Sequence, residues 1–232
     1  MFKKLLVICP TRERPDRAAE MLDSFAKTHS GDSLLIFVVD RCDSDLWRYK
    51  ELFKEYAEIS RYFIRTQETI TKHFNYIFEC MPDADYYSCS NDDFIYRTPG
   101  WDSQLIRAIE DSGRPGIAYG NDQMGRGILP TTSVISGEIP RALGWLQMPK
   151  LTHLCGDLVY KALGNRINNL IYLEDVIIEH KHFLNRKAEY DTTYARTNSR
   201  EMYIKDNEAF RDWLKYDFDE DAEKITKGGN DG

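Results

Sequence analysis

The feature that most constrains the fold is an alternation of two patterns between residues 4 and 90. Segments with apolar residues at helical spacing, such as 14–31 and 70–81, separate short apolar runs rich in β-branched residues. Strands that alternate with helices in this way build a parallel sheet covered by helices, so the sequence predicts an α/β fold. The four predicted strands are residues 4–9, 33–40, 61–66 and 85–90.

Polar and charged residues follow three of these strands directly. They occupy residues 10–14, 40–45 and 91–93. Ligands of such sheets bind beyond the carboxyl ends of the strands, where these three segments meet. We therefore expect a binding site at this edge of the sheet.

Two adjacent carboxylates, Asp92 and Asp93, end the fourth predicted strand. Like charges at this distance repel each other. One interpretation is a simple turn, because Asn91 and the two aspartates all favour turns. The other is a site for Mg²⁺ or Mn²⁺, which binds one or two carboxylates together with substrate phosphates. Such an ion relieves the repulsion and attracts a diphosphate.

The pattern is less regular after residue 113. Residues 123–140 are rich in Gly, Pro, Ser and Thr and predict an irregular, mobile segment. We expect one domain over residues 1–217 and an acidic, flexible tail at 218–232. The remaining predicted elements are strands at 116–122 and 169–183, and helices at 153–164 and 207–218.

Composition narrows the classes of function. The chain has 232 residues, 42% of them hydrophobic, and a net charge of -7. A general nucleic-acid binder is usually basic, so that class is disfavoured. The charge is uneven, however, because a basic stretch at 181–205 precedes an acidic one at 206–223. No apolar run is long enough to cross a bilayer.

The cysteines favour a cytoplasmic protein. There are five of them, widely spaced and without a CxxC pair. An odd, scattered set indicates reduced thiols rather than a disulfide framework or a zinc cluster.

Three motifs carry a resemblance to a known family. They are "VICPTRERPDRAAEMLDSF", "FVVDRCDSD" and "SNDDFIYRTPGWDSQL". In this order and spacing they resemble the GT-A glycosyltransferases, especially the inverting, family-2-like group. The resemblance implies a Rossmann-like mixed sheet with a parallel N-terminal half flanked by helices. It also implies that residues 1–110 bind a nucleotide sugar and that 111–217 bind the acceptor.

The resemblance also implies a set of donor-binding residues. The donor is a nucleoside diphosphate sugar, with UDP the leading nucleotide, bound together with Mn²⁺ or Mg²⁺. Asp93 holds the metal, although Asn91 replaces the first acidic residue of the family's DXD motif. Asp40 meets the uracil or ribose, and Asp43 is a second candidate. The other predicted contacts with the nucleotide are Pro10, Thr11, Arg12, Arg14, Lys72, Asn75, Asn91 and Asp92.

Two of these groups also have ordinary interpretations. The arginines suit diphosphate oxygens, but they are also common as solvated charges at the start of a helix. Lys72 and Asn75 lie three residues apart on one predicted helix face, which is equally typical of exposed side chains.

His180 and His182 form a second notable pair. In a strand, residues two apart project to the same face. The resemblance implies that one C-terminal histidine joins the metal, and imidazole is an acceptable ligand of Mn²⁺. The sequence does not choose between the two. His153 is an acceptor-site or structural candidate.

An inverting transferase needs a carboxylate that takes the proton of the acceptor hydroxyl. We predict Asp157 for this role, with Glu174 and Asp175 as rivals. The segment 122–138 is a candidate for closing over the donor. Trp101 and Trp145 are candidates for stacking on sugar or base, although packing is the more common role of such residues.

Other functions stay open at this stage. A protein of the same fold that binds a nucleotide sugar without catalysis is one alternative, and a nucleotidyltransferase is another. The latter usually has a Gly-rich loop after the first strand, and "CPTRERP" has no glycine. The acceptor is a glycan or lipid-linked saccharide, a protein side chain, or a modified base in DNA, as for some bacteriophage enzymes of this kind.

Overall fold

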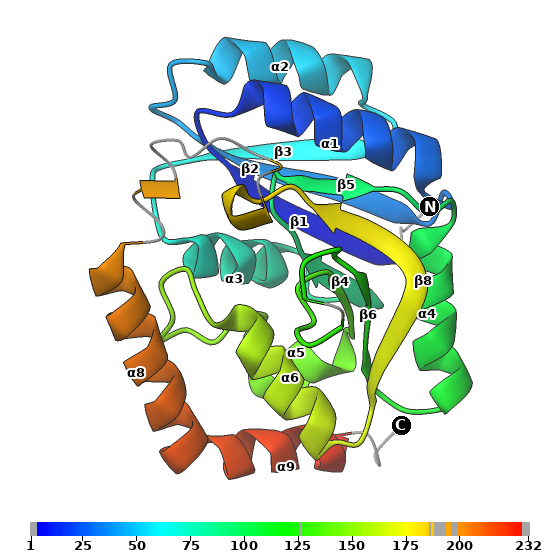
Figure 1. Ribbon diagram of the computed structural model, residues 1–232, viewed down its shortest axis with the longest axis vertical. Coiled ribbons are helices and arrows are strands. Elements are labelled where there is room, and N and C mark those ends of the chain that lie inside the picture. The colour runs from blue at the N-terminus through cyan, green and yellow to red at the C-terminus, as the bar shows by residue number, and fades with distance from the viewer. Residues whose placement is uncertain (1–3, 126, 186, 188–193, 196–198, 229–232) are drawn as a thin grey trace.

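The computed structural model describes residues 4–125, 127–185, 187, 194–195 and 199–228. Within them, eight strands form a mixed sheet in the order β3-β2-β1-β4-β7-β6-β8-β5. Figure 1 shows the strands in the middle of the molecule with helices on either side. The predicted α/β fold with a mixed sheet is confirmed.

The N-terminal half of the sheet is parallel, as predicted. β1 (Leu5–Thr11) pairs with β2 (Ser33–Asp40) on one side and with β4 (Tyr86–Cys89) on the other. β3 (Ser60–Arg65) pairs with β2 at the edge. β1 and β2 are buried on both faces, which accounts for their continuous apolar runs. The chain moves outward from β1 to β3 and then returns to β4, so the strand order reverses between β1 and β4.

The C-terminal half contains two strands that the sequence did not predict. One is β5 (Phe94–Tyr96), which follows the acidic pair at once and pairs antiparallel with β8. The other is β7 (Ser133–Ser136), inside the segment expected to be irregular. All four residues of β7 are buried between β4 and β6, so this part of the expected mobile segment is a core strand. The two remaining strands are β6 (Ile117–Asn121) and β8 (Leu170–His180).

Two apolar cores lie on opposite faces of the sheet because successive strand residues point in opposite directions. Leu5 and Val7 pack with one set of helices, whereas Leu6 and Ile8 pack with the other. The first set comprises α1 (Pro15–Thr28), α2 (Leu46–Glu55) and α4 (Trp101–Ser112). The second comprises α3 (Ile70–Cys80), α5 (Glu138–Leu143), α6 (Gly156–Arg166), α8 (Arg200–Tyr216) and α9 (Phe218–Gly228).

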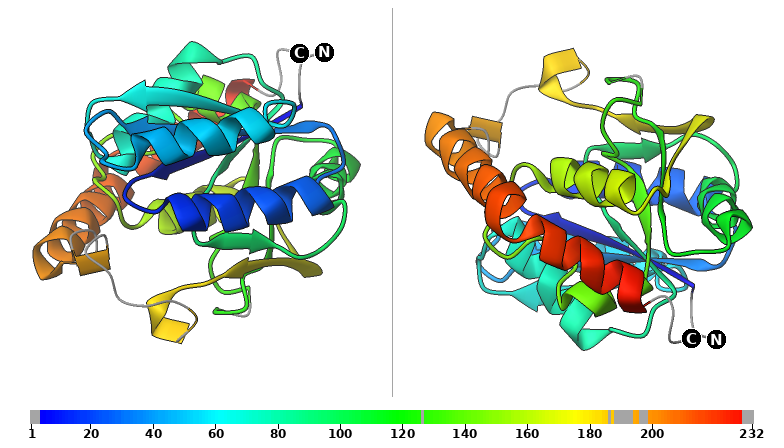
Figure 2. Two further views of the ribbon diagram at one scale, coloured as in Figure 1. Left: turned by 90° about the horizontal axis from the view of Figure 1, so that it is seen from above. Right: turned by 90° about the horizontal axis from the view of Figure 1, so that it is seen from below.

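The expected flexible tail from residue 218 is wrong over most of its length. Residues 218–228 form α9, and α8 and α9 follow one another along the outside of the molecule (Figures 1 and 2). Ala222 and Ile225 are buried, and Nε1 of Trp213 donates a hydrogen bond of 2.9 Å to Asp221. The acidic residues that suggested a tail lie in the first turn of α9, where the helix dipole favours negative charge. Residues 229–232 lie outside the described residues.

The "PGW" turn has a structural role. Gly100 adopts a φ of 67°, a conformation that glycine tolerates better than other residues. Trp101 is buried and stacks on Tyr96 with ring centroids 4.4 Å apart. Asp102 accepts hydrogen bonds from Ser30 and Ser33 and so ties α4 to the start of β2. Trp101 is therefore a packing residue.

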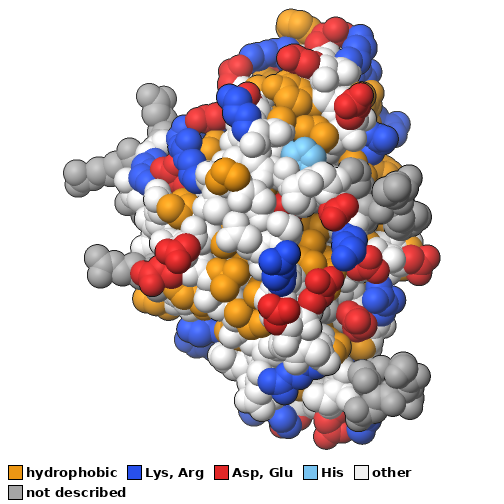
Figure 3. Space-filling view, turned by 90° about the vertical axis from the view of Figure 1, so that its right-hand side faces the viewer, with side chains coloured by type: hydrophobic (Ala, Val, Ile, Leu, Met, Phe, Trp, Pro, Cys, Tyr) orange, Lys and Arg blue, Asp and Glu red, His pale blue; other side chains and the backbone are white. Residues whose placement is uncertain are grey.

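The surface carries charge of both signs. On the face seen in Figure 3, acidic, basic and apolar side chains are interspersed. No helix among the described residues is long and apolar enough to cross a membrane. The five cysteines are all described and are free thiols.

Candidate functional site

A cavity of about 360 Å³ opens at the carboxyl ends of β1, β2 and β4. It lies where the strand order reverses, the usual ligand site of open α/β sheets. Every predicted site residue lines it except Asp43, Lys72 and Asn75. The lining residues from the N-terminal half of the chain are called here the N-terminal wall: Pro10, Thr11, Arg12, Arg14, Val38, Asp40, Gln67, Glu68, Ile70, His73, Phe74, Cys89, Asn91, Asp92, Asp93 and Phe94. Those from the C-terminal half are called the C-terminal wall: Pro130, Thr131, Ser133, Gln147, His153, Leu154, Cys155, Gly156, Asp157, Tyr160, His180, His182 and Tyr194.

Both carboxylate oxygens of Asp92 interact with neighbouring side chains of the protein. Oγ1 of Thr11 donates a hydrogen bond of 2.8 Å to Oδ2, and Nη1 of Arg14 lies 3.1 Å from Oδ1. The hydroxyl of Tyr49 accepts the backbone N–H of Arg14 and fixes the loop between β1 and α1. Burial raises the pKa of Asp92 to about 6, against the effect of Arg14. Asp92 therefore joins two strand ends, and both of its oxygens have partners.

The two oxygens of Asp93 have different surroundings. Oδ2 accepts a hydrogen bond of 2.7 Å from the hydroxyl of Tyr194. Oδ1 lies 3.3 Å from Nε2 of His180, yet it is buried and accepts no well-formed hydrogen bond from the described residues. Burial raises the pKa of Asp93, but His180 and Tyr194 more than offset this, so the pKa lies below its usual value. The carboxylate is charged and has one unsatisfied oxygen.

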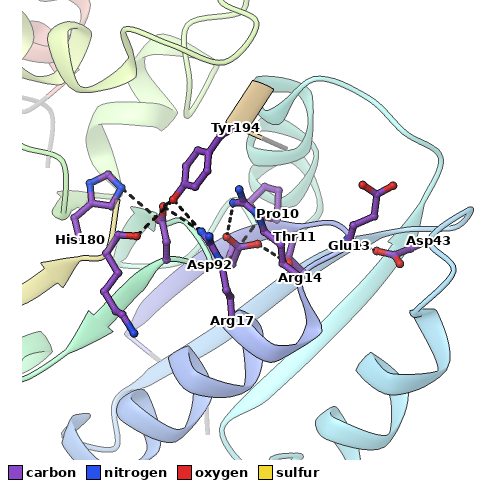
Figure 4. A network of polar contacts seen from close by, with 12 residues as sticks. Pro10, Thr11, Glu13, Arg14, Arg17, Asp43, Asp92, His180 and Tyr194 are labelled. Carbon is purple, nitrogen blue, oxygen red and sulfur yellow. Dashed lines mark hydrogen bonds and ion pairs between the residues drawn. The ribbon is translucent and has the colours of Figure 1, made fainter. Parts of the chain in front are cut away.

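Tyr194 is a site residue that the sequence did not indicate. It is buried, and its ring lies under the guanidinium groups of Arg14 and Arg17, at 4.3 and 5.0 Å. Nη1 of Arg17 also donates a hydrogen bond of 2.8 Å to its hydroxyl. Figure 4 shows Tyr194 reaching from the C-terminal part of the chain toward arginines at the start of α1. Burial raises the pKa of Tyr194, so the phenol is neutral and can donate to Asp93.

The structure gives the two histidines different surroundings, although both line the cavity and their ring centroids lie 5.1 Å apart. His180 is the last residue of β8, so the alternation of a strand does not extend to His182. His182 packs on Phe183 and Tyr194, with ring centroids 4.4 and 4.9 Å away. Burial lowers the pKa of His182 to about 4. Within the described part of the chain, no three His, Cys, Asp or Glu side chains converge as a metal cluster. His180 is the histidine beside Asp93.

Asp40 and Arg12 form a second polar group on the N-terminal wall. Oδ1 of Asp40 accepts the backbone N–H of Cys42 at 2.9 Å. Oδ2 lies 3.4 Å from Nη1 of Arg12, and neither atom has a hydrogen-bond partner among the described residues. These two buried atoms, an acceptor and a donor, are available for a ligand.

Asp43 supports this wall from behind. Its carboxylate accepts the backbone N–H groups of Glu13, at 2.6 Å, and Asp45, at 2.8 Å. Glu13 has a φ of 58°, an unfavourable value for a residue with a side chain, and this hydrogen bond holds it there. Asp43 thus shapes the loop between β1 and α1 rather than facing the cavity.

The structure brings neither Lys72 nor Asn75 to the cavity. Lys72 is exposed and pairs with Glu68 at 2.8 Å. Asn75 turns toward the C-terminal wall instead. Its Oδ1 accepts the N–H groups of Leu146 and Gln147 at 2.9 and 2.8 Å, and its Nδ2 donates to the Gln147 carbonyl at 2.7 Å.

Asp157 is the candidate base that lines the cavity. It lies in the first turn of α6, and burial raises its pKa. Its rivals, Glu174 and Asp175, are exposed on β8 and lie outside the cavity lining. His153 lines the same wall, whereas Trp145 does not.

A buried carboxylate holds the loop that leads to Asp157. Asp206 of α8 is fully buried and accepts three consecutive backbone N–H groups. The distances are 2.9 Å from Thr152, 2.7 Å from His153 and 2.6 Å from Leu154. Asp206 is another residue that the sequence did not indicate, because its partners lie more than fifty positions earlier.

The loop before β7 also contributes to the C-terminal wall. Pro130 and Thr131 line the cavity. The carboxylate of Asp122 accepts hydrogen bonds from the N–H groups of Met124 and Gly125 and from the Thr131 hydroxyl. Ahead of β7, the described residues of the segment 122–138 therefore form a loop whose beginning and end are both hydrogen-bonded to Asp122. Whether it moves over a ligand stays a prediction.

No protein-family model and no curated protein matches this sequence. Solved structures do match the fold. The mannosyltransferase PcManGT from Pyrobaculum calidifontis, in complex with GDP-Man and Mn²⁺, has a TM-score of 0.63 and 9% identity. The match covers 97% of this chain and 73% of that one. S. aureus TarS has a TM-score of 0.60 and 14% identity, over 75% of this chain and 36% of that one.

A shorter form of TarS, residues 1–349 in complex with UDP-GlcNAc, also has a TM-score of 0.60 and 14% identity. The match covers 75% of this chain and 57% of that one, so this chain spans only part of the length of TarS. At these identities the comparison concerns the fold. The chain has a GT-A-like glycosyltransferase fold.

Proposed function

We propose that this protein is a metal-dependent glycosyltransferase that transfers a sugar, with inversion, from a nucleoside diphosphate to an acceptor hydroxyl. The observation that carries the proposal is the convergence of three groups on one cavity. They are the Asp93–His180 pair, the Arg12–Asp40 pair and Asp157. The structural neighbours solved with GDP-Man and Mn²⁺ or with UDP-GlcNAc support it.

The residues present fit a divalent cation. Oδ1 of Asp93 is buried without a hydrogen-bond partner, and Nε2 of His180 lies 3.3 Å from it. Adjacent ligands of an octahedral ion, each about 2.1 Å from the metal, are about 3 Å apart. Asp93 and His180 would supply two ligands, and donor phosphate oxygens would supply others. A bound Mn²⁺ or Mg²⁺ stabilises negative charge on the departing diphosphate.

The Arg12–Asp40 pair suits a nucleobase or ribose. Oδ2 of Asp40 can accept the N3–H of uracil or a ribose hydroxyl, and Nε and Nη1 of Arg12 can donate to a carbonyl or a phosphate, because these atoms form ion pairs but no hydrogen bond with the described residues. UDP is therefore our proposed nucleotide. Arg14 is already committed to Asp92, so we assign it to shaping the site rather than to the donor.

Asp157 would accept the proton of the attacking hydroxyl. It lines the same cavity as these pairs but comes from the C-terminal wall, whereas Asp93, Arg12 and Asp40 come from the N-terminal wall. For inversion, a base has to reach the acceptor hydroxyl on the side of the sugar away from the diphosphate. The raised pKa makes it a stronger base than a solvated carboxylate. For the acceptor we propose a hydroxyl of a glycan or lipid-linked saccharide, with a modified DNA base as the alternative to compare.

The proposal is tested with a panel of UDP- and GDP-sugars, with and without Mn²⁺. We expect a UDP-sugar to raise the melting temperature only with the metal, and slow release of UDP in the absence of an acceptor. Binding without any UDP release, even with acceptors present, would instead indicate a non-catalytic binding protein. Release of pyrophosphate from a nucleoside triphosphate and a sugar phosphate would indicate a nucleotidyltransferase. Failure of every nucleotide sugar to bind would overturn the proposal.

A further inference from the structure

Tyr194 holds one oxygen of Asp93 and leaves the other open. Its hydroxyl donates to Oδ2 at 2.7 Å, whereas Oδ1 has no hydrogen-bond partner among the described residues and lies near His180. The hydroxyl proton is directed by a second contact, because the same oxygen accepts a hydrogen bond of 2.8 Å from Nη1 of Arg17. The phenol proton then has two acceptors within reach, Oδ2 of Asp93 at 2.7 Å and the Lys181 carbonyl at 3.5 Å, and the shorter contact with the charged carboxylate is the stronger one.

We propose that Tyr194, oriented by Arg17, is a positioning residue that fixes the Asp93 carboxylate so that Oδ1 faces a divalent cation beside His180. The inference rests on the proposed metal-dependent function. It adds a residue outside the motifs seen in the sequence and gives it a defined task.

The physical reason is the freedom of an unrestrained carboxylate. It can rotate about its last side-chain bond and can offer either oxygen, or both, to a metal. A hydrogen bond to Oδ2 removes the rotated and the bidentate arrangements before the ion arrives. Hydrogen-bond partners of metal ligands commonly change metal affinity by about 10- to 100-fold when they are removed.

The ring of Tyr194 is itself well held, as a positioning role requires. Arg14 and Arg17 lie over the ring at 4.3 and 5.0 Å, and His182 and Phe183 pack against it with centroids 4.9 Å away. The side chain is only 4% exposed. In Figure 4 the hydroxyl end of Tyr194 points into the polar network that contains Arg14, Arg17 and His180. These ring contacts do not need the hydroxyl, so packing and positioning can be separated.

Tyr194→Phe makes that separation, because it removes one oxygen and keeps the ring. The measurement is the dissociation constant of Mn²⁺ in the presence of UDP, from the electron paramagnetic resonance signal of free Mn²⁺. We expect binding to weaken about tenfold or more. The melting temperature without metal should change no more than in the matched control Tyr87→Phe. Tyr87 donates its hydroxyl to the Met81 carbonyl at the opposite end of β4 and should leave Mn²⁺ binding unchanged.

A second variant tests the positioning role without mutating Tyr194, in case Tyr194→Phe does not fold. Arg17→Lys keeps a positive charge near Asp93, whose Oδ2 lies 4.0 Å from Nη1 of Arg17, but removes the guanidinium donor that directs the Tyr194 hydroxyl, and we expect a smaller loss of Mn²⁺ affinity. Wild-type affinity in both variants would overturn the positioning role while the proposed function stands. If the wild-type protein with UDP takes up no Mn²⁺, the metal-dependent function fails and this inference fails with it.

Discussion

Most of the N-terminal wall of the cavity lies at or just beyond the ends of parallel strands, whereas part of the C-terminal wall is a set of loops held by distant side chains. On the first wall, Thr11 ends β1, Asp92 follows the neighbouring β4, and the two side chains contact each other at 2.8 Å. On the second, Asn75 of α3 holds residues 146–147 and Asp206 of α8 holds residues 152–154. Sheet topology places most of the first wall, but the loops at 146–147 and 152–154 behind the second depend on two individual side chains.

This difference implies different sensitivities to mutation. Backbone pairing between β1, β2 and β4 survives the loss of any one side chain at the strand ends. The loop before α6 has no such ladder, and its Cys155 adopts a φ of 67°. We therefore expect changes on the N-terminal wall to alter donor binding locally, and changes behind the C-terminal wall to alter both stability and catalysis.

The largest expected effect is on catalysis by Asp157→Asn. The amide cannot take the acceptor proton, so kcat should fall by about 10²- to 10⁴-fold. Donor affinity, measured by calorimetry with a UDP-sugar and Mn²⁺, should stay within about twofold, because Asp157 is not among the residues proposed to contact the donor. Glu174→Gln is the matched control and should leave kcat unchanged. A Glu174→Gln variant as impaired as Asp157→Asn would reassign the base.

The second largest effect should come from replacing Asp206, whose carboxylate holds the loop at residues 152–154. Asp206→Ala leaves three buried N–H groups without an acceptor, and we expect a stability loss of about 3 kcal/mol by chemical denaturation. Asp206→Asn keeps the shape but presents an amide, and it should lower kcat more than it raises the donor KM. Asp221→Asn is the comparison, because it loosens α8 from α9 without touching the loop. Equal kcat in Asp206→Asn and Asp221→Asn would mean that Asp206 only supports the fold.

The same contrast explains what the sequence could predict. Apolar runs and helical spacing predict six of the eight described strands and, in the first half of the chain, the alternation of strands and helices. The three-residue β5 and four-residue β7 are too short to give a periodic signal. The residues at strand ends followed from topology, so Asp40 and Asp93 could be assigned to the cavity. Tyr194 could not, because its partner Asp93 lies 101 positions earlier and no local pattern links them.

Asn75 shows a second reason for incomplete prediction. Its place on a helix face was expected, but helical spacing does not say which neighbour the face meets. In the structure its side chain points toward residues 146–147, where the amide makes three hydrogen bonds with backbone groups. The acidic residues of 218–221 were misread for a similar reason, since charge alone does not distinguish a tail from the first turn of a helix.

A smaller effect is the contribution of His73 to the pH dependence of stability. Helix α3 places this residue in the N-terminal wall. Burial, followed by the charge of Arg65, lowers its pKa to about 4, with Glu68 and Asp40 opposing. Between pH 6.5 and 4 the unfolded chain therefore binds a proton that the folded protein does not, so stability falls as the pH falls. Between pH 7.5 and 4.5, we expect the free energy of unfolding of His73→Gln to fall by about 2 kcal/mol less than that of the wild type. Denaturation curves at pH 7.5 and 4.5 check it, and parallel pH dependence in both proteins would contradict it.

The smallest and most local effect should come from Asp40→Asn. The variant keeps Oδ1 for the N–H of Cys42 but replaces Oδ2 with an NH₂ group facing the Arg12 guanidinium. Two donors then meet, and an N3–H or ribose hydroxyl loses its acceptor. We expect the donor KM to rise about tenfold, with kcat and the acceptor KM within about twofold. Steady-state kinetics with both substrates varied separates these terms. A change in the acceptor KM as large as that in the donor KM would show that the two walls are coupled, and the contrast between them would then lose its basis.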